Sequence, residues 1–190
     1  MSSEYAQLLK EIEAFYNFFA TFQLSRPVTS VANLTDGAVF FDILSLVYIL
    51  WFSGFFIFLE YSFFFASDTS YFRHPTRPGS SASGSARPIE NWVLRFSALK
   101  RLYRLMTQYV SDVLQKPTSS LDVPDLQAIA KDFDLGATLV MCRLLIVIGV
   151  QCERNKEFID KIRCLGEGDQ HLIMKAIEQV SLEILVCRRM

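Results

Sequence analysis

Apolar residues recur every three or four positions along most of this chain, and this period predicts α-helices. A first helix is expected over residues 4–22, where Leu8, Ile12, Phe15 and Phe19 share a face. Further helices are expected from about residue 37, over 91–114, after an N-cap at Asp122, over 135–150, over 152–164 and over 169–186. Since no stretch alternates with the period of a strand, the predicted fold class is all-α.

Residues 135–150 are apolar on nearly every side and are interrupted by Arg143. A segment of this length with a central arginine is too short and too polar to cross a bilayer. We therefore expect it to be the buried central helix of a bundle. The helix that follows is expected to turn Phe158, Ile159 and Ile162 toward this core.

The last predicted helix, residues 169–186, is apolar over an unusually wide arc. A surface helix needs an apolar stripe of about 100°, whereas the apolar residues here spread over roughly 200° of a helical wheel. They are Leu172, Ile173, Met174, Ala176, Ile177, Val180, Ile184 and Leu185. The additional arc centres on Gln170, Met174 and Ile177. Such a helix either packs on two sides within its own domain or offers its second side to a partner.

One stretch departs from the amphipathic pattern. Residues 43–59 contain no charge, and after Glu60 the Phe-rich sequence continues to Ala66. The length suffices for a transmembrane helix, but Glu60, the central Gly54 and the lack of a close positive cluster weaken this interpretation. Residues 73–88 are rich in Pro, Gly, Ser and Arg, which predicts a disordered linker.

Composition narrows the classes of function. The net charge is −1, so the chain lacks the clustered basic face typical of nucleic-acid binders. The chain has two histidines, no glycine-rich nucleotide loop and no evident acid pair. We therefore expect that the protein is not an enzyme and that it binds no small-molecule substrate and no cofactor. Four cysteines, none spaced C-x-x-C, are expected to be reduced and buried, without a metal site. These features favour a binding module.

Four motifs together resemble the N-terminal domain of the Hook family, a variant calponin-homology fold. Three of them are Leu34-Thr35-Asp36-Gly37 before an apolar helix, Asn91-Trp92 opening a long helix, and Pro124-Asp125-Leu126 before the central helix. The fourth and most specific comprises residues 152–159 and 169–177. The resemblance covers about residues 5–182 apart from the apolar stretch and the linker. It implies a calponin-homology-like helical bundle with an extra C-terminal helix.

The resemblance implies an adaptor that links cargo to cytoplasmic dynein for microtubule-based transport. It implies a cytoplasmic, cytoskeleton-associated protein that reaches membranes only through its cargo. In this family the domain binds an amphipathic helix of the dynein light intermediate chain, in a groove that involves the extra C-terminal helix. The family's key glutamine and the isoleucine seven residues later correspond to Gln170 and Ile177, and Met174 lies between them. We predict a partner-peptide groove at these three residues; the competing interpretation is that they pack inside.

The resemblance also suggests how the chain is divided. A single Hook-type domain is expected over residues 1–187, interrupted by an apolar insert at 48–67 and by the linker at 73–88. Without the insert, Val47 would join Asp68 smoothly, and phenylalanine codons resemble the pyrimidine tract at the end of an intron. We interpret the insert as a retained intron translated in frame, which transcript sequencing tests. Because family members continue into long coiled coils, we expect a fragment or a truncated gene model.

Two other functions stay open from the sequence. A calponin-homology domain can bind microtubules or actin through a basic surface, and the candidates here are Lys100, Arg101 and Arg104 with Arg95. Salt-sensitive cosedimentation with filaments tests this function. A small membrane protein anchored through residues 43–66 would resist extraction by carbonate washing.

Overall fold

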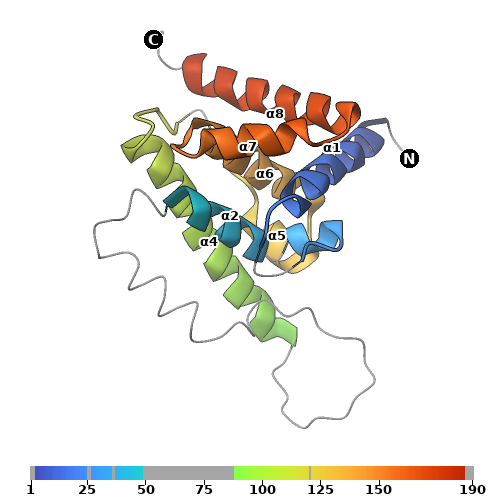
Figure 1. Ribbon diagram of the computed structural model, residues 1–190. Helices are drawn as coiled ribbons and strands as arrows, with labels where there is room; N and C mark the ends of the chain where they lie inside the picture. The colour runs from blue at the N-terminus through green and yellow to red at the C-terminus, as the bar shows by residue number, and fades with distance from the viewer. Residues whose placement is uncertain (1–2, 25–26, 36, 49–87, 120, 187–190) are drawn as a thin grey trace.

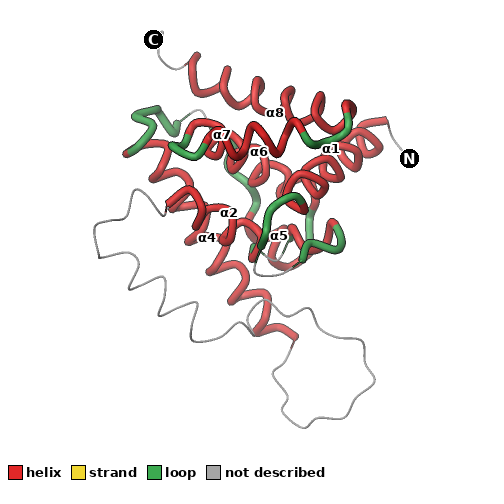
Figure 2. Tube along the Cα trace, in the orientation of Figure 1, coloured by secondary structure: helices red, strands yellow, loops and turns green. Residues whose placement is uncertain are grey.

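The computed structural model describes residues 3–24, 27–35, 37–48, 88–119 and 121–186, with the backbone alone at 32, 48, 88–91 and 183–186. The elements are α1 (Ser3–Ala20), the 3₁₀ helix η1 (Val31–Leu34), α2 (Ala38–Tyr48), α4 (Pro88–Asp112), α5 (Leu126–Asp132), α6 (Leu135–Gln151), α7 (Asn155–Arg163) and α8 (Glu167–Val186). Throughout the described ranges the ordered elements are helical (Figures 1 and 2). The all-α prediction is confirmed.

Helix α6 is the centre of the bundle. It contacts α1, α2, α4, α5, α7 and α8, and Figure 1 shows it behind α7 with the other helices around it. Ten of its residues are buried, from Thr138 to Gly149. The interruption at Arg143 is compensated by α1, because the Arg143 guanidinium bonds both Glu11 carboxylate oxygens at 2.7 and 2.8 Å. The predicted buried central helix is confirmed.

A cluster of phenylalanines joins α1 and α2 to α7. Its members Phe15, Phe18, Phe19, Phe40 and Phe158 are fully buried, and Phe22 is nearly so. The rings of Phe22 and Phe158 lie 5.2 Å apart between centroids. Offset or tilted ring pairs at such distances add stabilisation to the burial of apolar area. This cluster fixes the position of α7 against the start of the chain.

Two helix starts show how local sequence sets the element boundaries. Asp125 is the N-cap of α5, with its carboxylate accepting from the backbone N–H groups of Gln127 and Ala128. The prediction of Asp122 as this cap was wrong, because Pro124 keeps the residue before it out of helical conformation. Before α2, Gly37 has φ of 82°, a left-handed conformation that glycine adopts without steric cost.

The remaining boundaries differ slightly from the predictions. Helix α4 begins at Pro88, inside the predicted linker, since proline is tolerated in the first turn. Helix α7 begins at Asn155 rather than at residue 152. Except for Tyr48 and Pro88, the predicted insert at 48–67 and linker at 73–88 lie outside the described residues.

Within the described ranges, no single helix has both the length and the apolar character to cross a membrane. Helices α6 and α7 pass that test only as a pair, with a bend of 117° between them. Residues 49–66 of the proposed membrane anchor are outside the described part of the chain.

Candidate functional site

Helix α8 lies across α1 and α6 with one side in the core. Ile173, Ala176 and Val180 are buried there. Gln170 and Ile177 are half-buried, and Met174 is 47% exposed. The three predicted site residues therefore lie along the edge of the buried side and are not enclosed by the chain. Ile184 and Leu185, which belonged to the predicted apolar arc, are outside the described side chains.

Gln170 connects this edge of α8 to the end of α7. Its side-chain Nε2 donates hydrogen bonds to the backbone oxygens of Leu165 at 2.7 Å and Arg163 at 3.2 Å. Carbonyl groups at the end of a helix have no partner within that helix, so a side-chain donor there acts as a cap. We call this pair of bonds the Gln170 link. A helical wheel of α8 does not predict this link, because the acceptors are the backbone oxygens of the last residue of α7 and of the turn after it.

The buried side of α8 faces α1, and Asp169 lies on that side, about 100° around the wheel from Gln170. Asn17 of α1 donates to the Asp169 carboxylate at 2.8 Å, so consecutive residues of α8 bond to different neighbours.

Two hollows lie on the described part of the domain. One is small and is bordered by three residues of α6 and by Leu121, Asp122, Gln179 and Val180. The other, of about 500 Å³, lies between α1 and α6. Neither is lined by Gln170, Met174 or Ile177.

Helix α7 contributes a further apolar residue on its surface. Ile159 is 36% exposed, so its predicted inward position was wrong. On a helical wheel it lies about 100° from the buried Phe158, on the side away from Glu157 and Lys161. A wheel centred on Phe158 alone would have placed Ile159 at the edge. We use the name α7–α8 surface for Ile159, Gln170, Met174 and Ile177.

The inner edge of α7 is attached to α1 by a lysine. Lys161 donates from Nζ to the backbone oxygen of Thr21 at 2.6 Å and lies 4.4 Å from the Phe22 ring centroid. This role of Lys161 was not predicted; its signal in the sequence is the spacing of three residues from Phe158, which places the lysine beside the buried ring. Arg154 also reaches inward, toward the backbone oxygen of Leu46 in α2 at 3.5 Å.

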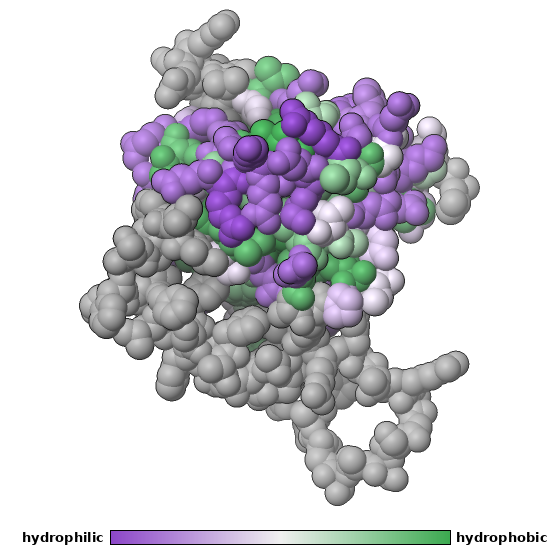
Figure 3. Space-filling model, in the orientation of Figure 1, coloured by the Kyte–Doolittle hydropathy of each residue, from purple (hydrophilic) through white to green (hydrophobic). Residues whose placement is uncertain are grey.

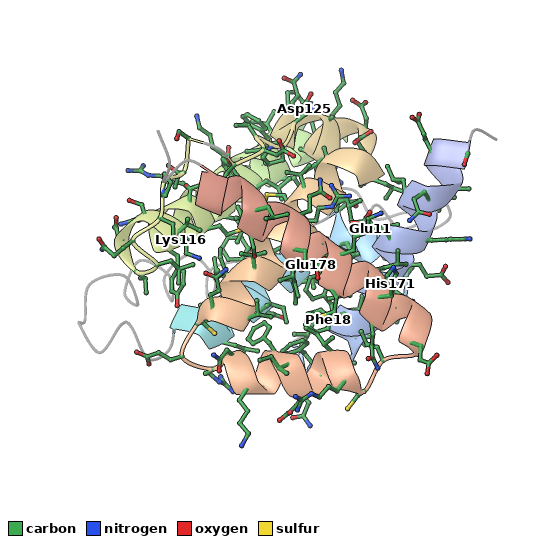
Figure 4. All side chains as sticks on the ribbon, turned by 90° about the horizontal axis from the view of Figure 1, so that it is seen from above. Glu11, Phe18, Lys116, Asp125, His171 and Glu178 are labelled. Atoms are coloured by element: carbon green, nitrogen blue, oxygen red, sulfur yellow. The ribbon has the colours of Figure 1, made fainter. Side chains whose placement is uncertain are left out.

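The views of the side chains agree with this arrangement. In Figure 3, patches of hydrophobic residues (green) appear between α8 and α7, bordered by hydrophilic residues (purple). In Figure 4, α7 and α8 diverge from their connecting turn, with Phe18 labelled between them. His171 is exposed. The α7–α8 surface combines the apolar side chains of Ile159, Met174 and Ile177 with the polar side chain of Gln170.

Burial favours the neutral forms of Tyr109, Cys142 and Cys152. Burial, reinforced by nearby Cys152 and Glu153, raises the pKa of Tyr109 to about 12. Burial also raises the pKa of the Cys142 and Cys152 thiols. Both cysteines are free and buried as predicted, whereas Cys164 is free and exposed, so that part of the prediction was wrong. No group of three metal-binding side chains occurs within the described ranges.

The basic residues proposed for filament binding are partly engaged within the domain. Lys100 and Arg104 of α4 are exposed, whereas Arg101 is half-buried. The Arg95 guanidinium lies 4.4 Å above the ring of Phe133. Filament binding by this surface stays a prediction.

Comparisons with known proteins identify the class to which this fold and surface belong. A family model described as the HOOK domain matches residues 83–179, about half of the chain. The chain therefore belongs to the HOOK domain family. The model match includes α7 and the site residues of α8.

Individual relatives agree with this assignment. The chain is 38% identical over 101 residues to Protein hook of Drosophila melanogaster, covering 53% of this chain and 14% of that protein. It is 31% identical over 113 residues to Protein Hook homolog 2 of Homo sapiens, covering 60% and 15%. It is 26% identical over 168 residues to Protein Hook homolog 2 of Xenopus laevis, covering 88% and 20%. The chain thus spans a fifth or less of these relatives.

A solved structure shows the same fold. The solution structure of the conserved domain of HOOK1 protein from mouse matches with a TM-score of 0.66 and 23% identity, covering 92% of each chain. The expected calponin-homology-like bundle with a further C-terminal helix is confirmed. The match concerns the fold.

Proposed function

We propose that this domain is an adaptor module that binds an amphipathic helix of the dynein light intermediate chain on the α7–α8 surface. The partner is the one that membership of the family implies. The observation that carries the proposal is the position of Gln170, Met174 and Ile177 on one edge of α8. Their side chains are half-buried or exposed, so the domain itself leaves them within reach of a visiting helix.

The proposed mechanism is recognition of a helix by an apolar surface between two helices. Ile177 and Met174 supply apolar area, and methionine adapts its shape to the partner. Ile159 extends the apolar area onto α7. Gln170 supplies a directional hydrogen bond to the peptide backbone. In the cell such a module would link cargo to dynein in the cytoplasm, in association with microtubules.

The proposed domain organisation follows from contacts that span the chain. Helix α1, near the beginning, contacts α6 and α8, and its Asn17 bonds Asp169. Segments on both sides of the proposed insert therefore contribute to one core. We propose a single domain over residues 1–187 in which residues 48–67 are an insertion and residues 73–88 contain a linker.

The experiment is a titration of a fluorescently labelled light-intermediate-chain helix with the full chain and two variants. We expect a micromolar dissociation constant, on the order of −8 kcal/mol. Full burial of an isoleucine side chain is worth about 1.5–3 kcal/mol. Ile177→Ala should therefore weaken binding about tenfold to a hundredfold, and Gln170→Ala should also weaken it.

The matched control is Leu182→Ala. Leu182 is 61% exposed on the same helix and lies about 140° around the wheel from Ile177. It should bind the peptide like the unmodified chain. Equal losses in Leu182→Ala and Ile177→Ala, with unchanged melting curves, would contradict the proposed surface.

A further inference from the structure

The Gln170 link has a consequence for binding at the α7–α8 surface, and the inference rests on the proposed function. We propose that Gln170 exchanges partners: its amide bonds the end of α7 in the free domain and is transferred to the backbone of the incoming helix. Peptide binding therefore opens the link between α7 and α8. The geometry points to this exchange, since the same side chain is both committed within the domain and placed at the surface.

The free domain uses the donor group of Gln170 completely within the chain. Its Nε2 bonds two backbone oxygens, those of Arg163 and Leu165. A donor held by two acceptors is not available to a peptide carbonyl until one of these bonds opens. A directional bond from this group to a peptide thus replaces bonds that the domain already has, and the net gain is smaller than for an unengaged donor.

The surroundings of the link allow it to open without unfolding the helix. Gln170 is half-buried, and Met174 on the next turn is exposed, so water can reach the carbonyl groups that the amide leaves. The start of α8 stays attached on its buried side, because Asp169 accepts from Asn17 of α1. The backbone N–H of Gln170 also bonds the Gly166 oxygen at 2.9 Å. Release of the side chain therefore leaves α8 in place.

The inner side of α7 is fixed while this outer link changes. Phe158 is fully buried among the aromatic rings, and Lys161 bonds the Thr21 oxygen. The adjustment is therefore confined to the turn at residues 164–166 and to the near edge of α8.

The rates of amide hydrogen exchange at the turn at residues 164–166 test whether Gln170 changes its hydrogen-bond partners. The backbone N–H groups of Cys164 and Leu165 bond the oxygens of Lys161 and Ile162 at 3.2 and 3.1 Å. Their exchange rates, with that of the Gln170 N–H, would be recorded in the free full-length chain. In Gln170→Ala they should rise about threefold to tenfold, the factor that a hydrogen bond of ordinary net strength provides.

The matched control is Gln179→Ala, which removes an exposed glutamine of α8 about 180° around the wheel from Gln170. It should leave exchange at the turn unchanged. The same rates would then be recorded for the unmodified chain saturated with the light-intermediate-chain helix. We expect exchange at Cys164 and Leu165 to rise on binding, whereas the N–H groups of Phe158 and Ile162 become no less protected.

The outcomes separate this inference from the proposed function. If the peptide binds and exchange at Cys164 and Leu165 falls or stays constant, the link persists in the complex and the inference is wrong, although the surface binds. Unchanged exchange at the turn in free Gln170→Ala also overturns it. If the peptide does not bind at all, the proposed function fails, and a raised rate in Gln170→Ala then identifies the link as a static cap.

Discussion

The two sides of α7 differ in how they are attached to the rest of the domain. Toward α6, Phe158 lies so close to Gly149 that a Cβ atom added there would be 2.3 Å from two ring carbons. Toward α8, the described attachment includes the Gln170 link. Packing at the first side leaves no room for change, whereas hydrogen bonds at the second can be exchanged. A binding surface can therefore adjust beside a helix that stays fixed.

The largest effect is expected for Gly149→Ala. The added methyl group would overlap the Phe158 ring, which is fully buried and has no free space to enter. Overpacking of this kind lowers stability by about 3 kcal/mol. Urea unfolding measures it.

The control for Gly149→Ala is a glycine of α8, the helix on the other side of α7. A Cβ atom on Gly168, in the first turn of α8, meets nothing within 4 Å. Gly168→Ala should raise the free energy of unfolding by up to about 1 kcal/mol, because alanine favours the helix. Equal stabilities of the two variants would contradict the distinction between a filled and an open side of α7.

The second prediction concerns Tyr109, which lies close to Cys152 and Glu153 at the turn from α6 to α7. Burial raises its pKa from 10 in the unfolded chain to about 12 in the folded domain. The folded domain therefore holds the phenol proton more tightly. The resulting contribution to the free energy of unfolding is complete below pH 10 and is lost as the pH rises toward about 12.

The size of this loss is about 2–3 kcal/mol, from a shift of about two pKa units. Urea unfolding between pH 9 and 12 would measure it against Tyr109→Phe, in which other tyrosines and lysines titrate as before. The slope with pH should be less steep in Tyr109→Phe. Identical slopes in the unmodified chain and in Tyr109→Phe would mean that the Tyr109 hydroxyl group is more hydrated than its burial indicates.

The smallest effect is expected for Lys161→Met. This change keeps the apolar stem but removes the bond to Thr21 and the contact of the charge with Phe22. The expected loss in the free energy of unfolding is about 1 kcal/mol. Peptide affinity should stay constant, since Phe158 keeps α7 in place. Lys156→Met, on the exposed side of α7, is the control; an equal loss in both variants would show that Lys161 has no special role.

Much of the fold could be predicted from the sequence because it depends on the apolar period. Helix α6 was predicted to within one residue at its end. A run of sixteen mostly apolar residues can be buried only at the centre of a bundle. The start of α5 was predicted at the wrong aspartate, although Pro124 separates Asp122 from Asp125 and favours a helix that begins after it. The correct N-cap was therefore predictable from the local sequence alone.

The candidate site was predictable only in part. The edge formed by Gln170, Met174 and Ile177 follows from a helical wheel together with a family resemblance. The bonds of Gln170 do not, because they depend on where the turn at 164–166 places the end of α7. The exposure of Ile159 depends similarly on the neighbours of α7. Sequence period defines the faces of one helix, whereas the contact between two helices depends on their relative placement.

The bond between Asn17 and Asp169 joins residues 152 positions apart, and this separation bears on how the protein is made. A ribosome that adds 5–20 residues per second reaches Asp169 about 8 to 30 s after it has added Asn17. During that interval the aromatic side of α1, with Phe15 and Phe18, cannot be covered by α7 or α8. The nascent chain therefore leaves this side accessible to chaperones until α7 and α8 have been synthesised.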